Sequence, residues 1–82
     1  MANGDREVIV YTSPFCAPCE QLKQYLTANS VQFKVRDLMM DEAAQDRLEE
    51  ARIRSTPAIE VDGKLIGGDE LTKDKVKDLL GL

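Results

Sequence analysis

The only two cysteines of this 82-residue chain, Cys16 and Cys19, stand three positions apart. The residues before them, 7–12 (EVIVYT), are mostly β-branched or aromatic and predict a buried strand. Ser13-Pro14 ends that strand, and from Cys19 onward the apolar residues recur with a helical period. The pair therefore lies where a strand turns into a helix, and it defines the first strand–loop–helix unit of the fold.

The next two segments have contrasting periodicities. The first helix has an apolar face formed by Cys19, Leu22, Tyr25, Leu26 and Ala28. Residues 31–38 alternate apolar and polar side chains and predict a strand whose buried face holds Val31, Phe33 and Val35. A helix over residues 42–52 follows, capped by Asp41, with a core stripe of Ala44, Leu48 and Ala51.

The last third of the chain predicts a hairpin and a helix. Strands 58–61 and 64–66 flank Asp62-Gly63, a favoured two-residue hairpin turn, and Gly67-Gly68 ends the second strand. Thr72 then caps a helix with Val76, Leu79 and Leu80 as its apolar positions. The order β-α-β-α-β-β-α predicts a single α/β domain, 1–82. A right-handed crossover makes the first pair of strands parallel, and the hairpin adds an antiparallel pair. The result is a four-stranded mixed sheet flanked by three helices.

Charge and hydropathy narrow the class of protein. The formal net charge is −4, and no basic stripe could follow a chain of phosphates, so nucleic-acid binding is not expected. The chain has no apolar run of about 18 residues, so we expect no membrane span. The N-terminal MANGDREVIV lacks the basic start and long apolar stretch of a secretory signal. We therefore expect a cytoplasmic protein, in whose reducing compartment cysteines are more often catalytic or metal-bound than structural.

The cysteine pair has three competing interpretations. A structural zinc site needs about four nitrogen or sulfur ligands. This chain has two thiols and no histidine, so carboxylates or a second chain would have to complete such a site. A structural disulfide here would close a very small loop and constrain little of the unfolded chain, and two inert buried thiols are a related structural reading. The third interpretation is a reversible two-electron switch.

The position of the pair favours the switch. A helix N-terminus presents unpaired N–H groups and a partial positive charge, which stabilise a thiolate. Cys16 lies at the strand-to-helix break and should be reachable, whereas Cys19 shares the apolar face of the helix and should be covered. Cys16 is then expected to attack a disulfide, and Cys19 to resolve the mixed disulfide. Pro18 fits the first helical turn, where its missing N–H loses no helical hydrogen bond.

From about Glu7 to Leu80 the chain resembles the glutaredoxin branch of the thioredoxin superfamily. Three blocks carry the resemblance: VYTSPFCAPCEQLKQYL, RSTPAIEVDG and LIGGDEL. The resemblance implies a thioredoxin fold and a dithiol–disulfide oxidoreductase that reduces protein or glutathione mixed disulfides. It also implies cell redox homeostasis and electron transport as the wider role.

The resemblance also assigns roles to residues. It makes Cys16 the nucleophile and Cys19 the resolving thiol, and it makes Pro57 a cis-proline that faces them. The backbone of Thr56 would hold a substrate peptide or glutathione. The substrate- or glutathione-binding set implied in this way is Pro18, Thr56, Pro57, Gly67, Gly68, Asp69 and Glu70.

Some positions depart from the common patterns of glutaredoxins and thioredoxins. Ser13 stands where many members carry a lysine, and Ala17-Pro18 replaces the usual Pro-Tyr and resembles the thioredoxin motif. Phe15 stands where thioredoxins have tryptophan, and we expect it to pack beside the motif as part of an apolar docking rim.

The expected partners follow from the resemblance. We expect a monomer without a bound cofactor or metal, re-reduced by glutathione or by a thioredoxin-reductase-type flavoenzyme. Its substrates would be disulfide-containing proteins, with ribonucleotide reductase among the candidates. The alternative is a dimeric carrier that bridges an iron–sulfur cluster or zinc through Cys16.

Overall fold

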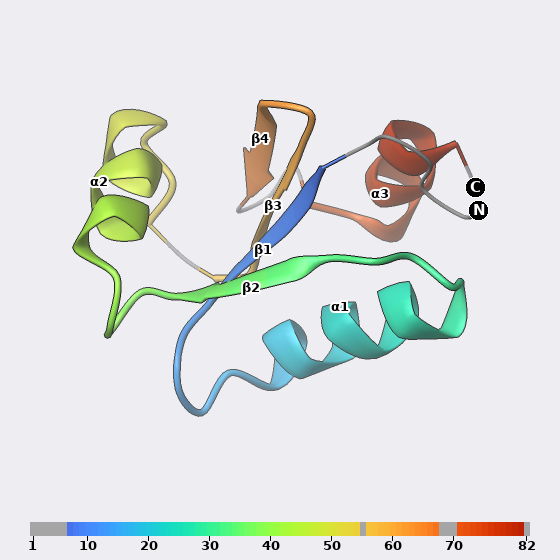
Figure 1. The fold of residues 1–82 in the computed structure, drawn as a ribbon, viewed down its shortest axis with the longest axis horizontal. Helices are drawn as coiled ribbons and strands as arrows, with labels where there is room; N and C mark the ends of the chain where they lie inside the picture. The colour runs from blue at the N-terminus through green and yellow to red at the C-terminus, as the bar shows by residue number, and fades with distance from the viewer. Residues whose placement is uncertain (1–6, 55, 68–70, 82) are drawn as a thin grey trace.

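A computed structural model describes residues 7–54, 56–67 and 71–81 (Figure 1). Within these residues the elements follow the predicted order β-α-β-α-β-β-α. They are β1 (Val8–Thr12), α1 (Ala17–Ala28), β2 (Lys34–Asp37), α2 (Glu42–Glu50), β3 (Ala58–Val61), β4 (Lys64–Gly67) and α3 (Lys73–Leu80). None of the helices in this described part combines the length and the apolar character needed to cross a membrane.

The strands form one mixed sheet in the order β2-β1-β3-β4. β1 is parallel to β2 and antiparallel to β3, and β3 is antiparallel to β4. The parallel pair is connected through α1, as a crossover requires. β1 therefore lies inside the sheet, and its carboxyl end leads directly into the loop that carries the cysteines. This arrangement is the thioredoxin fold that the sequence predicts.

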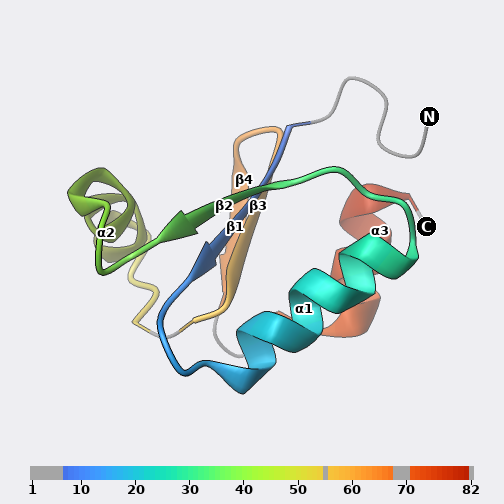
Figure 2. The ribbon, with the colours of Figure 1, turned by 60° about the horizontal axis from the view of Figure 1, so that its bottom comes forward.

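Helices cover both faces of the sheet (Figure 2). α1 and α3 lie together on one face, and α2 lies on the other. Because successive strand residues point to opposite faces, β1 contributes Val8 and Val10 to the α1–α3 side and Ile9 and Tyr11 to the α2 side. All five residues of β1 are buried. The strand that precedes the cysteines is thus fixed by packing on both sides.

The hairpin between β3 and β4 turns at Asp62 and Gly63, as predicted. Both residues have positive φ, 51° and 87°, which is the backbone that a two-residue turn needs to match the twist of its strands. The turn is also connected to the start of β1, because Asp62 Oδ1 accepts a hydrogen bond from the Glu7 amide at 2.9 Å.

The second strand is shorter than predicted. β2 spans Lys34–Asp37 rather than 31–38, and Val35 is 47% exposed. Val31 and Phe33 do pack on the α1–α3 side. Because β2 is an edge strand, the core that receives Val31 and Phe33 does not extend over Val35, and the prediction that Val35 is buried was wrong.

Two helix predictions also need correction at their carboxyl ends. α2 ends at Glu50 rather than at residue 52, and Ala51 is its exposed C-cap rather than part of the core stripe. Arg52 adopts a φ of 61°, which stops the helix and returns the chain towards the sheet, where Ile53 packs. Ala28, the last residue of α1, is likewise exposed. Both alanines follow the helical period without reaching the core.

Candidate active site

Cys16 is the N-cap of α1. Its backbone is still extended (φ −107°, ψ 100°), and its Sγ accepts a hydrogen bond from the amide of Cys19 at 3.1 Å. Pro18 lies in the first turn of the helix, where its missing N–H leaves no helical bond unmade. The sulfur of Cys16 therefore occupies the place where a helix presents its free amides and its positive dipole end.

The two cysteines differ in exposure. Cys16 is partly exposed, whereas Cys19 is only 1% exposed. Their Cα atoms are 5.2 Å apart, and their sulfurs lie at disulfide distance. The asymmetry predicted from the helical stripe is present: one sulfur is within reach of solvent, and the other is covered directly behind it.

Thr56 and Pro57 lie against the pair. The Thr56–Pro57 peptide bond is cis, as the resemblance implied. The Thr56 hydroxyl donates to Cys16 Sγ at 3.6 Å and is itself 2.7 Å from the hydroxyl of Ser13. A polar contact of the Thr56 side chain with the sulfur, and the inclusion of Ser13, were not predicted from the sequence.

Phe15 does not pack beside the motif. Its side chain is fully exposed, and its backbone has a φ of 58°. Positive φ is a strained conformation for a bulky residue, and such strain clusters at functional sites. An uncovered phenyl ring thus stands immediately before Cys16. The expectation that it packs against the motif was wrong, whereas a position on an apolar rim agrees with its exposure.

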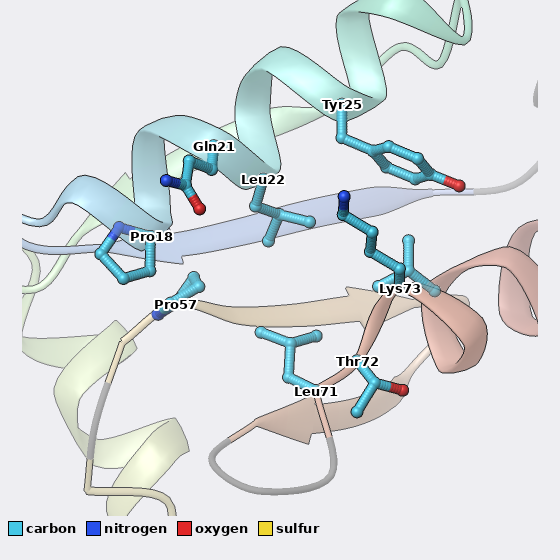
Figure 3. Close-up of a pocket in the computed structure, with 9 residues that line it drawn as sticks. Pro18, Gln21, Leu22, Tyr25, Pro57, Leu71, Thr72 and Lys73 are labelled. Carbon is cyan, nitrogen blue, oxygen red and sulfur yellow. The ribbon is translucent and has the colours of Figure 1, made fainter.

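A pocket of about 190 Å³ opens next to the cysteine loop, between α1 and the start of α3 (Figure 3). Pro18 and Pro57 form the end nearest the cysteines, and Leu22 and Leu71 form apolar walls. Lys73 extends its amine from α3 towards α1, near Tyr25. The described lining is therefore mostly apolar, with Lys73 as its cation. Pro18 adjoins Cys19, and Pro57 adjoins Thr56.

Gly67 has a packing reason to be glycine. It ends β4 opposite Ala58, and a Cβ at this position would lie 2.8 Å from Ile53 Cγ2 and 3.1 Å from Ala58 Cβ. Its place in the strand explains the residue without any ligand. The other implied glutathione contacts, Gly68, Asp69 and Glu70, lie outside the described residues.

Among the described residues, the titratable groups with shifted pKa values lie away from the cysteine pair. A hydrogen bond from Arg36, reinforced by the Ala44 amide, lowers the pKa of Asp41 at the start of α2. Burial, followed by the hydrogen bond to Glu60, raises the pKa of Tyr11.

Lys23, one turn beyond the cysteines, forms an ion pair with Glu20 at 2.9 Å. In the described residues, no group of three or more His, Cys, Asp or Glu side chains forms a candidate metal site.

The fold and the cysteine pair together define a thioredoxin-fold protein with a dithiol site at a helix N-terminus. The glutaredoxin family model matches residues 8–66, more than half of the chain. The chain therefore belongs to the glutaredoxin family, and fold and family support a thiol–disulfide oxidoreductase-like function.

Solved structures agree with this assignment. The thioredoxin-like protein BC3987 is 35% identical, with a TM-score of 0.79, over 90% of this chain and 100% of its own. A mutant of actin interacting protein 5 is 31% identical, with a TM-score of 0.71. The match covers 95% of this chain and 90% of that protein's chain. Glutaredoxin 1 from Francisella tularensis, solved with cacodylate, is 24% identical with a TM-score of 0.67, over 94% and 99%, and shows the fold alone. A search of curated protein sequences finds no match.

Proposed function

We propose that this protein is a dithiol–disulfide oxidoreductase in which Cys16 is the nucleophile and Cys19 the resolving thiol. The observation that supports the proposal most directly is the unequal exposure of two sulfurs at disulfide distance, with the exposed one at the N-cap of α1. A helix N-terminus stabilises a thiolate, and the thiolate is the attacking species.

The proposed reaction has two exchanges. The Cys16 thiolate attacks one sulfur of a substrate disulfide, forms a mixed disulfide and releases the other substrate sulfur as a thiolate. Cys19, after losing its proton, attacks Cys16 Sγ, forms the Cys16–Cys19 disulfide and releases the second substrate sulfur. Two electrons pass to the substrate, and its two thiolates take up the two protons that the cysteines lost.

Protein disulfides are the substrates that the surface near Cys16 supports best. Phe15 offers an uncovered aromatic ring beside the nucleophile, and the pocket between α1 and α3 offers apolar walls. Aromatic side chains are enriched at the centres of protein interfaces. We therefore propose disulfide-containing proteins as substrates, with ribonucleotide reductase as one candidate and the cytoplasm as the compartment.

A reduction assay tests the proposed activity and its electron source together. The oxidised protein is mixed with insulin and NADPH, in one tube with glutathione and glutathione reductase and in another with thioredoxin reductase. We expect insulin reduction and NADPH oxidation with one of the two systems. Neither system supporting turnover, while dithiothreitol still reduces the Cys16–Cys19 disulfide, would exclude both proposed electron sources.

Purification without oxygen tests the alternative of a metal- or cluster-bridged dimer. We expect a colourless protein without stoichiometric iron or zinc. A brown, iron-loaded dimer that loses its colour in a Cys16→Ser variant would contradict the proposal that Cys16 is a free nucleophile.

A further inference from the structure

The hydroxyl groups of Ser13 and Thr56 form a chain of contacts that ends at Cys16 Sγ. Ser13 Oγ and Thr56 Oγ1 are 2.7 Å apart, and Thr56 Oγ1 is 3.6 Å from Cys16 Sγ. All three side chains are partly buried. Ser13 and Thr56 are 43 positions apart in the sequence, so their contact is a product of the fold.

The sheet register explains why they meet. β1 and β3 are antiparallel, with Tyr11 opposite Ala58 at the end of the ladder. Continuing that register by two residues brings Ser13 opposite Thr56. Their side chains meet through the 2.7 Å contact between the two hydroxyls. Both hydroxyls therefore lie just beyond the paired ends of β1 and β3.

The direction of the hydrogen bonds follows from proton counting. Each hydroxyl has one proton to donate. Cys16 Sγ lies at disulfide distance from Cys19 and has no proton, so Thr56 must donate to the sulfur. The oxygen of Thr56 then accepts, and Ser13 is the donor. Both dipoles point towards Cys16, and successive hydrogen bonds aligned in this way strengthen one another.

The donors to this sulfur are neutral. In the described part of the chain, Cys16 Sγ accepts from the Cys19 amide and from the Thr56 hydroxyl. The nearby Lys23 is engaged with Glu20. Stabilisation of a negative charge at Cys16 thus depends on the helix end and on oriented dipoles, and the Thr56 hydroxyl is the donor that comes from outside α1.

We propose that Ser13 and Thr56 form a hydroxyl relay that stabilises the Cys16 thiolate, an inference that rests on the proposed role of Cys16 as nucleophile. Thr56 acts directly on the sulfur, and Ser13 acts through Thr56 as a positioning residue. The relay favours loss of the thiol proton to solvent when Cys16 is reduced. It equally favours Cys16 as the leaving sulfur when a second thiolate attacks the outer sulfur of a mixed disulfide at Cys16, forms a disulfide with that sulfur and releases the Cys16 thiolate.

The test is the pH dependence of Cys16 alkylation in the reduced full-length protein. Iodoacetamide forms a carbon–sulfur bond with the thiolate and releases iodide, and peptide mass spectrometry assigns the label to Cys16 rather than to the buried Cys19. Thr56→Val removes the hydroxyl but keeps a β-branched side chain, and Ser13→Ala removes the second hydroxyl. Thr56→Ser restores the donor, and Thr27→Val, on the exposed face of α1, is the matched control.

We expect Thr56→Val to slow alkylation about threefold to tenfold on the acidic side of the profile, without lowering the plateau at high pH. Ser13→Ala should have a smaller effect of the same kind. The double variant should match Thr56→Val alone, because Ser13 acts through Thr56. Thr56→Ser and Thr27→Val should both resemble the wild-type protein.

Several results would overturn the relay. An unchanged profile in Thr56→Val, or a loss confined to the plateau, would assign Thr56 a purely structural role. Additive effects in the double variant would show that Ser13 does not act through Thr56. Alkylation requires no disulfide substrate and no reductase, so a protein that fails to reduce insulin can still confirm or overturn the relay.

Discussion

Cys16 combines an extended backbone with the first free amides of a helix, and this position accounts for its expected reactivity. The Cys19 amide donates to its sulfur at 3.1 Å. A thiol at such a position titrates below the ordinary value of about 8.5. We expect the thiolate absorbance near 240 nm of the reduced protein to rise well below that pH and to be lost in Cys16→Ser. A single rise at the ordinary value would contradict a stabilised thiolate.

Gly67 supports a stability prediction. A methyl group at this position would meet Ile53 Cγ2 at 2.8 Å and Ala58 Cβ at 3.1 Å. Overpacking of this kind costs about 1–3 kcal/mol, so Gly67→Ala should lower the free energy of unfolding by that amount in urea titrations. In an Ile53→Ala background the same substitution should cost less. An equal cost in both backgrounds would show that the contact with Ile53 is not the cause.

Single residues differ in how far the sequence predicts them. The burial of Cys19 follows from its place on the helical stripe, and the cis bond before Pro57 follows from the family resemblance. The exposure of Phe15 does not follow, because its left-handed backbone belongs to the β1–α1 connection and bulky residues seldom adopt it. The contact of Ser13 with Thr56 depends on the register of β1 and β3, which the sequence does not state.

At the scale of elements, the start of α2 links folding to pH. Asp41 caps the helix through the Ala44 amide at 3.0 Å and pairs with Arg36 at 2.9 Å. The hydrogen bond from Arg36 is the main cause that lowers the pKa of Asp41 in the folded protein. The resulting stabilisation is present above the unfolded carboxyl's pKa of about 3.9. It is lost as the pH falls through the lower folded value.

Asp41→Asn tests this coupling. Asparagine keeps an oxygen that can cap the helix but has no charge and does not titrate. We expect wild-type protein to lose more stability than the variant between pH 6 and pH 2, measured by urea unfolding at each pH. Curves that fall in parallel would show that Asp41 contributes nothing to the acid sensitivity.

The types and order of the elements were predictable, but their ends were not. A β-branched run, alternation and the helical period indicate the elements seen in the described residues, and Asp62-Gly63 identifies the hairpin. The patterns at Val35 and Ala51 continue beyond the region that is covered. Val35 is exposed because β2 is an edge strand. Ala51 is exposed because α2 has ended before the left-handed Arg52. Both features arise only in the folded chain.

Across the whole molecule, the chemistry lies at one end of a sheet that is packed on both faces. β1 is buried from end to end and leads into Cys16, while β3 begins just after Thr56 and Pro57. The site therefore lies in short segments that adjoin the two central strands and the start of α1, and packed elements of this kind hold reacting groups more accurately than loops do. The expected unit is a monomer, because the proposed chemistry needs only one pair of cysteines.

Sedimentation velocity tests whether the protein is a monomer. We expect one species of about the 9.2 kDa chain mass at micromolar concentration, in both the oxidised and the reduced state. Thiol-dependent dimerisation on addition of iron or zinc, abolished in Cys16→Ser, would instead support the carrier alternative.

The assignment of Cys16 as nucleophile and Cys19 as resolving thiol is tested most directly by trapping mixed disulfides. Cys19→Ser and Cys16→Ser proteins are each incubated with a disulfide substrate such as insulin and analysed by non-reducing mass spectrometry. We expect Cys19→Ser to accumulate a mixed disulfide at Cys16, and Cys16→Ser to form none and to lack reductase activity. Equal trapping at both positions, or a mixed disulfide at Cys19 in the Cys16→Ser protein, would contradict the assignment of nucleophile and resolving thiol.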